Sequence, residues 1–379
     1  MKRKTLLGCS LLLCLLLCAC SQILPSEYVQ LQPHNTAEAP LQTDALSAST
    51  FSELKSSILS LIKTGTEHGK IRVYSYDGDI EQDLSRAVLE VTRDEPLGAY
   101  AVDYISHSCS LIVSYYEISI DVTFRRSVAQ MQKIEYYSSG VSTEAKERLR
   151  RAVRTGEKSL VMHFAYYINA DFKQMIRDYF DEEPQTIIAM PEVTVSQYPE
   201  NGSARIVEIT MDFPETAQRL AQMQKAVEEN VGAAVVYSRY SASDFGRADL
   251  LLHYLTERFS YEEKDSKTPV YSLFCEGLAD SEAAAKGWKL LCDAAELPCY
   301  TVKGLKSGRE YWWNIVQLDG RFMHVDPLTA LLTNTFATYT DAQMPDYYWN
   351  SADYPACTPV PAVQVETPPA AKPADEPEE

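Results

Sequence analysis

Residues 311–327 read YWWNIVQLDGRFMHVDP and give the clearest structural signal in the chain. The pair Asp319-Gly320 at their centre favours a two-residue type I′ turn, whose two positions both need a positive φ angle. Such a turn pairs Leu318 with Arg321, and this pairing fixes the register of the strands on either side. The segment is therefore predicted to form an antiparallel β-hairpin.

The predicted register also assigns side chains to faces. Successive side chains of a strand point to opposite sides, so one face of the hairpin gathers Tyr311, Trp313, His324 and Asp326. Trp313 then lies opposite Asp326, and Tyr311 is a diagonal neighbour within reach of a long side chain. We expect the Tyr311 hydroxyl and the Asp326 carboxylate to meet on this face.

Upstream of the hairpin, the spacing of apolar residues predicts two helices. The first begins at Ser243-Asp244, which can cap a helix, and carries Leu251, Leu252, Leu255 and Phe259. The second runs from Ser281 to Ala295 and has one apolar stripe, made of Ala284, Trp288, Leu291 and Ala295. A loop through Thr268-Pro269 is expected between them.

These motifs together resemble bacterial transglutaminase-like domains. Residues 271–288 (YSLFCEGLADSEAAAKGW) and 291–298 (LCDAAELP) are similar to that family's nucleophile helix, and residues 311–314, 319–320 and 324–327 are similar to its His-Ala-Trp-Asn, Asp-Gly and His-Val-Asp-Pro motifs. The resemblance covers roughly residues 205–357. It implies an α+β fold of the papain type, with a helix packed on an antiparallel sheet.

The resemblance also implies a degenerate active site. It puts Ser281 at the nucleophilic cysteine and Tyr311 at the histidine, whereas Asp326 keeps the orienting acid. A serine depends wholly on a general base, and a tyrosine of ordinary pKa, about 10, holds its own proton at neutral pH. We therefore expect no catalytic residue here, but an old cleft lined also by Trp288, Trp313 and His324.

Ordinary structural roles exist for the same residues. Ser281 is a suitable helix N-cap, and the Tyr311 hydroxyl can hydrogen-bond a buried Asp326. The tryptophans are more often core residues than ligand platforms. An alternative is a weakly active transglutaminase- or protease-like acyl transferase or amide hydrolase that uses Ser281 or Cys275. Cys275-Glu276-Gly277 imitates the nucleophile motif, but it needs a six-residue insertion and lies before the helix start.

The N-terminus is similar to a bacterial lipoprotein leader. Lys2-Arg3-Lys4 is a basic region, and Leu6–Ala19 is apolar but shorter than the roughly 20 residues of a membrane-spanning helix. It ends at Cys18-Ala19-Cys20, so residues 1–20 are interpreted as a signal peptide with Cys20 lipidated. Cleavage after Ala19 by an ordinary signal peptidase is the alternative. A diacylated Cys20 predicts a membrane-anchored lipoprotein on the extracytoplasmic face.

Composition limits the partners. The formal net charge of −18 disfavours binding to nucleic acid. An odd set of cysteines follows the leader and Cys20, so a fully paired disulfide framework is excluded, and the pairing stays open among Cys109, Cys275, Cys292, Cys299 and Cys357. No cluster has metal-ligand spacing, so neither a metal nor another cofactor is expected.

An internal repeat precedes the C-terminal domain. The segment that starts Asp83-Leu84 is similar to the one that starts Asp171-Phe172, and Ala129–Lys133 (AQMQK) is identical to Ala221–Lys225. We expect two duplicated α/β repeats, at about 70–140 and 158–230 within residues 51–230. Each is read as a helix, two strands and a helix.

The remaining segments complete the predicted organisation. Residues 21–50 are polar and are read as a flexible tether, and residues 358–379 as a disordered tail rich in Pro and Glu. The transglutaminase-like domain is placed at 231–357. The expected function is a non-catalytic surface module that binds a peptide, a cell-wall fragment or a protein partner.

Overall fold

The computed structural model describes residues 46–138 and 142–359. The predicted leader with Cys20, most of the tether and nearly all of the tail lie outside the described residues. Helices and largely antiparallel sheets make up this part of the chain, consistent with the predicted α+β class. Among the described helices, none combines the length and the apolar character that crossing a membrane requires.

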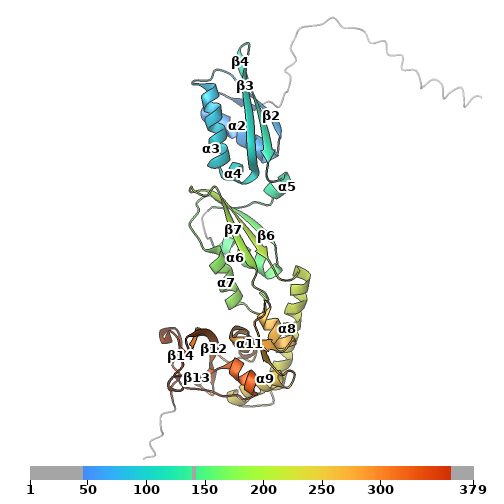
Figure 1. Ribbon diagram of the computed structural model, residues 1–379, viewed down its shortest axis with the longest axis vertical. Coiled ribbons are helices and arrows are strands. Elements are labelled where there is room, and N and C mark those ends of the chain that lie inside the picture. The colour runs from blue at the N-terminus through green and yellow to red at the C-terminus, as the bar shows by residue number, and fades with distance from the viewer. Residues whose placement is uncertain (1–45, 139–141, 360–379) are drawn as a thin grey trace, which may run out of the picture. The chain divides into compact units, whose positions relative to one another are not determined.

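The first unit is a four-stranded sheet with helices. Its strand order is β1-β2-β4-β3, with β1 parallel to β2 and the other pairs antiparallel. The elements are β1 (Leu46–Ala48), α2 (Phe51–Thr64), β2 (His68–Val73), α3 (Ile80–Arg93), α4 (Pro96–Ala101), β3 (Val102–Ile112) and β4 (Tyr115–Phe124), followed by the short α5 (Val128–Met131) (Figure 1).

The second unit repeats this order of elements, without a counterpart of α4. It contains β5 (Glu135–Tyr137), α6 (Thr143–Thr155), β6 (Ser159–Phe164), α7 (Phe172–Glu182), β7 (Glu192–Tyr198) and β8 (Arg205–Asp212). Its sheet order, β5-β6-β8-β7, and its one parallel pair, β5 with β6, match the first unit. Each unit thus runs strand, helix, strand, helix, hairpin.

The expected series of a helix, two strands and a helix is present in each copy, as α3, β3, β4 and α5 and as α7, β7, β8 and the helix Ala217–Ser238, but the expected bounds leave out the elements that open each unit. Each unit opens with a three-residue strand and a helix that precede residues 70 and 158, so β1 also shortens the expected tether of residues 21–50. A strand of three residues is too short to show alternation in sequence, and only its pairing with β2 or β6 defines it.

The structure also changes which residues of the two repeats correspond to each other. Asp171 is the N-cap of α7, whereas Asp83 lies inside α3, whose N-cap is Asp79. The motif match was one helical turn out of register, because apolar residues recur every three or four positions along a helix. The shared AQMQK segment begins two residues after the N-cap Ser127 but five after the N-cap Thr216.

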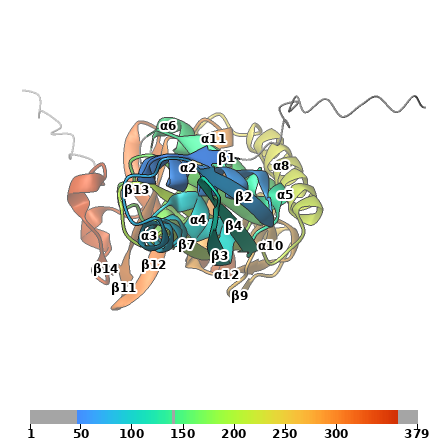
Figure 2. The ribbon, with the colours of Figure 1, turned by 90° about the horizontal axis from the view of Figure 1, so that it is seen from above.

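The C-terminal region packs helices against a sheet of order β13-β12-β11-β14. Figure 2 shows β14 beside β11. The helices are α8 (Ala217–Ser238), α9 (Asp244–Thr256), α10 (Pro269–Cys275), α11 (Ser281–Ala294) and α12 (Pro327–Thr333). The strands are β9 (Glu262–Glu263), β10 (Leu278–Ala279), β11 (Cys299–Lys306), β12 (Arg309–Leu318), β13 (Arg321–Val325) and β14 (Tyr347–Tyr348), with 3₁₀ turns at Asp341–Gln343 and Ser351–Asp353.

The predicted hairpin register is confirmed. Leu318 pairs with Arg321 and Asn314 with Val325 along β12 and β13. Asp319 and Gly320 have φ angles of 48° and 79°, as a type I′ turn requires. The whole face assignment of the hairpin follows from these two residues.

The predicted helix over 281–295 is confirmed as α11, whose apolar stripe lies in the core of this region. Ala284, Trp288 and Leu291 are each at most 1% exposed and pack with residues of α9 and the sheet. Part of α8 joins the same core through Leu220 and Val227. The expected boundary at residue 231 therefore falls inside a continuous helix, because α8 buries its apolar side against the C-terminal elements.

The helix at Ser243 is also confirmed, with the Ser243 hydroxyl accepting a hydrogen bond from the Gly246 N–H. Phe259 lies beyond its end at Thr256. The expected loop at Thr268-Pro269 instead leads into α10, with Pro269 in its first turn. Proline is tolerated there because the first N–H groups of a helix have no partner within the helix.

Candidate functional site

Asp326 is the centre of the site. It follows β13 and is the N-cap of α12, and its Oδ1 accepts a 3.0 Å hydrogen bond from the N–H of Thr329. The residue is only 4% exposed. A buried carboxylate needs several partners, since losing its hydration is otherwise very unfavourable.

Four side chains supply those partners. The hydroxyl of Tyr311 donates to both carboxylate oxygens, at 3.0 and 3.2 Å. Tyr347 donates to Oδ2 at 2.6 Å, the Thr329 hydroxyl donates at 2.7 Å, and the Lys306 ammonium at 2.7 Å completes an ion pair. The ammonium also lies over the rings of Tyr311 and Tyr347, 4.4 and 4.9 Å from their centres. The carboxylate is saturated.

These hydrogen bonds and the burial of the site shift the pKa values of Asp326 and of the two tyrosines. Burial by itself raises the pKa of Asp326, but the hydrogen bonds from Lys306, Tyr347 and Thr329 outweigh it and the pKa is lowered. Burial and the adjacent carboxylate raise the pKa of both tyrosines above the ordinary value. At neutral pH Asp326 is therefore ionised and Tyr311 keeps its proton, so Tyr311 acts as a donor and not as a base.

Ser281 is the first residue of α11, and the expectation that it caps this helix was wrong. The N-cap is Asp280, whose Oδ1 accepts a 2.7 Å hydrogen bond from the Ala283 N–H. The two residues are adjacent, and a carboxylate competes well with a hydroxyl for the N–H groups of a first turn.

This cap has a chemical consequence. The start of a helix can stabilise a thiolate or an alkoxide through its free N–H groups and its dipole. Here Asp280 already uses the Ala283 N–H, and Glu282 adds a second negative charge on the other side of Ser281. An alkoxide at Ser281 would therefore form between two carboxylates and without an imidazole.

The cleft beside Ser281 has a volume of about 520 Å³. It is bordered by the start of α11, by the end of β9 and the residues just after it, by the turn between β11 and β12, and by α12. Its lining residues are Glu263, Asp265, Asp280, Ser281, Glu282, Lys306, Ser307, Arg309, Glu310, Tyr311, Trp312, Leu328, Thr329 and Leu332. The acidic side chains outnumber the basic ones in this lining.

Three of the residues expected in the cleft are in the core instead. Trp288, Trp313 and His324 are at most 1% exposed and do not line the cleft. Trp313 and His324 share the Tyr311 face of the hairpin, as the register requires, but β14 and the segment after it cover them: the ring of Trp349 lies 5.7 Å from Trp313 and 4.8 Å from His324. Trp312, on the other face, lines the cleft.

Cys275 does not have the environment of a nucleophile. It ends α10, at the negative end of that helix, and its sulfur lies 3.8 Å from the side-chain amide of Asn230. Burial, followed by the charge of Glu276, raises the pKa of its thiol. All five cysteines that the structure describes are free thiols.

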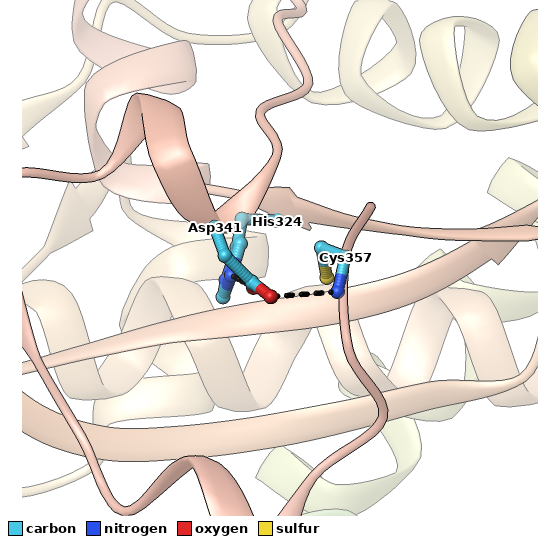
Figure 3. Close-up of side chains that lie close together, drawn as sticks. All are labelled: His324, Asp341 and Cys357. Carbon is cyan, nitrogen blue, oxygen red and sulfur yellow. Dashed lines mark hydrogen bonds and ion pairs between the residues drawn. The ribbon is translucent and has the colours of Figure 1, made fainter. Parts of the chain in front are cut away.

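His324, Asp341 and Cys357 form the one cluster with metal-ligand chemistry among residues 46–138 and 142–359; their ligand atoms lie within 4.8 Å of one another (Figure 3). The Trp313 indole donates to His324 Nδ1 at 3.0 Å, and an indole N–H can only donate. The imidazole proton is then on Nε2, which donates to Asp341 at 2.8 Å.

This tautomer does not suit a metal. A histidine ligand needs a free lone pair on the nitrogen that faces the ion, and Nε2 has none. Asp341 Oδ2 accepts from the backbone N–H of Cys357 at 3.1 Å, and burial raises the pKa of the Cys357 thiol to about 12. Its hydrogen bonds instead hold the segment 339–357 against the sheet. The backbone hydrogen bonds between His324 and Tyr339 contribute to the same contact.

Sequence reasoning missed Lys306, Thr329 and Tyr347. A signal for Lys306 was present: Ser307-Gly308 is a second two-residue turn, with φ angles of 51° and 79°. It pairs Lys306 with Arg309 and Gly304 with Tyr311, so Lys306 falls on the Tyr311 face. No local pattern places Tyr347, which reaches Asp326 only because β14 pairs with β11.

Comparisons with known proteins give weak similarity. No family model and no curated protein matches the chain. Among solved structures, a TGase aligns with a TM-score of 0.25 at 11% identity, over 60% of this chain and 65% of its own. A proposed cysteine protease from Cytophaga hutchinsonii has a TM-score of 0.24 at 10% identity, over 43% and 68% of the two chains.

A third solved structure, a proposed protease from Parabacteroides distasonis, has a TM-score of 0.22 at 9% identity, over 68% of this chain and 39% of its own. This chain thus spans just under two thirds of the length of the first of these structures. The structural neighbours are transglutaminase-like and cysteine-protease-like proteins at low similarity.

Proposed function

We propose that this protein is a membrane-anchored surface lipoprotein whose transglutaminase-like C-terminal region binds a peptide and has lost catalysis. The observation that carries the proposal is the saturation of Asp326 by Tyr311, Tyr347, Lys306 and Thr329. In a Cys-His-Asp site the acid orients an imidazole. Here its oxygens are engaged by two phenols, a hydroxyl and an ammonium.

Loss of catalysis does not close the cleft. About 520 Å³ remains beside Ser281, which is within the size range of ligand pockets. Its lining residues carry charged groups that can bind polar parts of a ligand, whereas Trp312 borders the cleft but is only 7% exposed. Such a lining suits an extended peptide better than an apolar cofactor.

The charges favour a cationic group on that peptide. Of the lining acids, Glu282 is paired with Lys286 and Glu310 with Lys303, while Lys306 is paired with Asp326. The exposed Glu263 and Asp265 leave one side of the cleft negative. An amino group, from a lysine or a peptide N-terminus, would complement these two carboxylates.

A binding experiment tests the ligand class. Fluorescent decapeptides that differ only by Lys or Glu at their centre would be titrated with the chain from Ser21 to Glu379 and followed by anisotropy. The lysine peptides should bind more tightly, and Glu263→Gln with Asp265→Asn should remove most of that preference. Glu228→Gln with Glu229→Gln, on the exposed face of α8, is the matched control.

Activity is tested in parallel. The same protein should show no hydrolysis of amide substrates, no incorporation of an amine into casein and no stoichiometric labelling by a fluorophosphonate at Ser281 or by iodoacetamide at Cys275. Steady turnover that disappears in Ser281→Ala or in Cys275→Ala would establish the alternative, a weakly active acyl transferase or amide hydrolase.

A further inference from the structure

The turn between β3 and β4 carries an exposed apolar surface. Leu111, Ile112 and Val113 are 63%, 39% and 99% exposed, respectively. Tyr74, at the adjacent end of β2, is 46% exposed, and its ring lies 5.2 Å from that of Tyr115. The turn between β3 and β4 is at the upper end of the first unit in Figure 1, and we call Leu111, Ile112, Val113, Tyr115 and the neighbouring Tyr74 the apolar tip.

The composition around the tip is unusual for this chain. Residues 104–116 contain no Asp, Glu, Lys or Arg, although such residues make up 23% of the protein. Residues 73–76 at the neighbouring end of β2 are also uncharged. The surface of a strongly acidic protein is thus interrupted here by aliphatic side chains with tyrosines behind them.

The backbone conformation of the turn also indicates that the exposed valine has a function. Val113 has a φ angle of 50°, in the left-handed region that a β-branched side chain rarely adopts. A two-residue hairpin turn ordinarily has Asn, Asp or Gly at such a position. Backbone strain of this kind is retained where a function needs the side chain, and here it puts a valine at the extreme end of the hairpin.

The length of the chain before β1 brings the apolar tip within reach of the membrane that would hold Cys20. The first described strand begins at Leu46, on the same rung of the sheet as Ile71 and Ile118. Val113 is five positions before Ile118, so along the strand direction this rung lies at most about 17 Å from the tip. The residues from Ser21 to Ala45 allow a covalent reach from Cys20 of at most about 90 Å.

We infer that the apolar tip inserts into the interface of the lipid bilayer that holds the protein. This inference rests on the proposed anchor at Cys20. Aliphatic side chains with tyrosines behind them suit the boundary between headgroups and acyl chains. The lack of carboxylates at the tip also removes the repulsion that the rest of the acidic surface meets at an anionic membrane. Insertion would fix the orientation of the first unit at the membrane.

The test uses the full lipidated chain in vesicles of phosphatidylethanolamine with a minor share of phosphatidylglycerol. Val113→Trp places an indole at the tip, and brominated lipid quenches indoles that reach the acyl chains. Strong quenching with a blue-shifted emission is expected. Val236→Trp, at a 61% exposed position on α8, should show neither effect.

A second arm examines affinity without the anchor. The chain from Ser21 to Glu379 should sediment with the same vesicles at high lipid concentration, and Val113→Asp should lower the bound fraction by about tenfold, because a carboxylate is disfavoured at the interface. Circular dichroism should show an unchanged fold for this variant. Val236→Asp should bind like the unmodified chain.

The possible outcomes distinguish a failure of tip insertion from a failure of the proposed lipid anchor at Cys20. If Cys20 incorporates labelled palmitate but the indole at position 113 is not quenched, the inference is overturned and the anchor stands. Shielding of that indole only when membrane proteins are added would point to a protein partner and would also overturn insertion into lipid. Without incorporation at Cys20 the proposed anchor fails, and vesicle binding by the unlipidated chain then decides the inference alone.

Discussion

The hydroxyl of Tyr347 donates a 2.6 Å hydrogen bond to Oδ2 of Asp326, across 21 residues of chain. This contact joins the edge strand β14 to the start of α12, and Oδ2 also accepts hydrogen bonds from Lys306 and Thr329. It makes the carboxylate a structural anchor for the C-terminal segment, and several consequences can be measured.

Tyr347→Phe should lower the free energy of unfolding by about 1.5–3 kcal/mol, because it removes a hydrogen bond to a buried charged group and keeps the ring. Urea denaturation measures the loss. The control is Tyr348→Phe, whose residue is 62% exposed and should change stability by less than about 0.5 kcal/mol. Equal effects of the two variants would contradict the assigned role of Tyr347.

Ionisation of Asp326 should make the stability of the folded protein depend on pH. Its pKa is lowered in the folded protein, so its contribution is complete above the ordinary aspartate pKa of about 3.9 and is lost as the pH falls through the lower folded value. Asp326→Asn keeps a capping side chain but cannot titrate. The stability difference between the two proteins should therefore be constant near pH 6 and shrink toward pH 3. A difference that grows on acidification would refute the assignment.

Lys286 is the most buried described lysine and joins two elements. It is 1% exposed, and its ammonium lies 2.7 Å from both Asp181 of α7 and Glu282 of α11. Replacing both acids, Asp181→Asn with Glu282→Gln, leaves the ammonium without a counter-charge and should reduce stability by about 3–5 kcal/mol.

The matched control for this pair lies three residues further along α11. Lys289 pairs with Asp293 on the surface of the helix, so Asp293→Asn should reduce stability by less than about 1 kcal/mol. Thermal denaturation of both variants gives the comparison. If the double variant were no worse than the control, Lys286 would be adequately hydrated and the described contacts would be unimportant.

Gly304 should not tolerate a side chain. A Cβ there would overlap the carbonyl oxygen of Tyr348 and approach the Trp313 ring to 2.7 Å, so Gly304→Ala must separate β14 from β11. We expect a loss of at least about 2 kcal/mol and weaker amide protection of Tyr347 in hydrogen exchange. Gly232→Ala meets no atom within 4 Å and should stabilise α8 by up to about 1 kcal/mol.

His324 should stay neutral with its proton on Nε2. Burial lowers its pKa and Asp341 only partly opposes this, so folding disfavours protonation and stability falls as the pH drops below about 6.5. Long-range ¹⁵N–¹H spectra of the imidazole should show the Nε2–H tautomer from pH 8 down to about 6.5, the ordinary histidine pKa. Zinc addition should change neither these spectra nor the melting temperature.

Much of the fold followed from local patterns. Asp319-Gly320 gave the register of the hairpin, and the apolar stripe of 284–295 gave α11, because both signals depend on neighbours a few residues apart. The meeting of Tyr311 with Asp326 follows from that register by simple counting. The three-residue strands β1 and β5 had no such local signal, so the bounds of both repeated units were missed.

The composition of the candidate site shows the division between sequence and tertiary structure. From the residue types at positions 281, 311 and 326, the resemblance to transglutaminase-like domains predicted a site without a ready nucleophile or a base. Whether Asp326 is free, and whether Trp313 and His324 reach the cleft, depended on the packing of β14 and the segment 339–357 across the sheet. Contacts such as Tyr347 with Asp326 join residues far apart in the chain, and no periodicity encodes them, because they arise only when separate elements bury their apolar faces together.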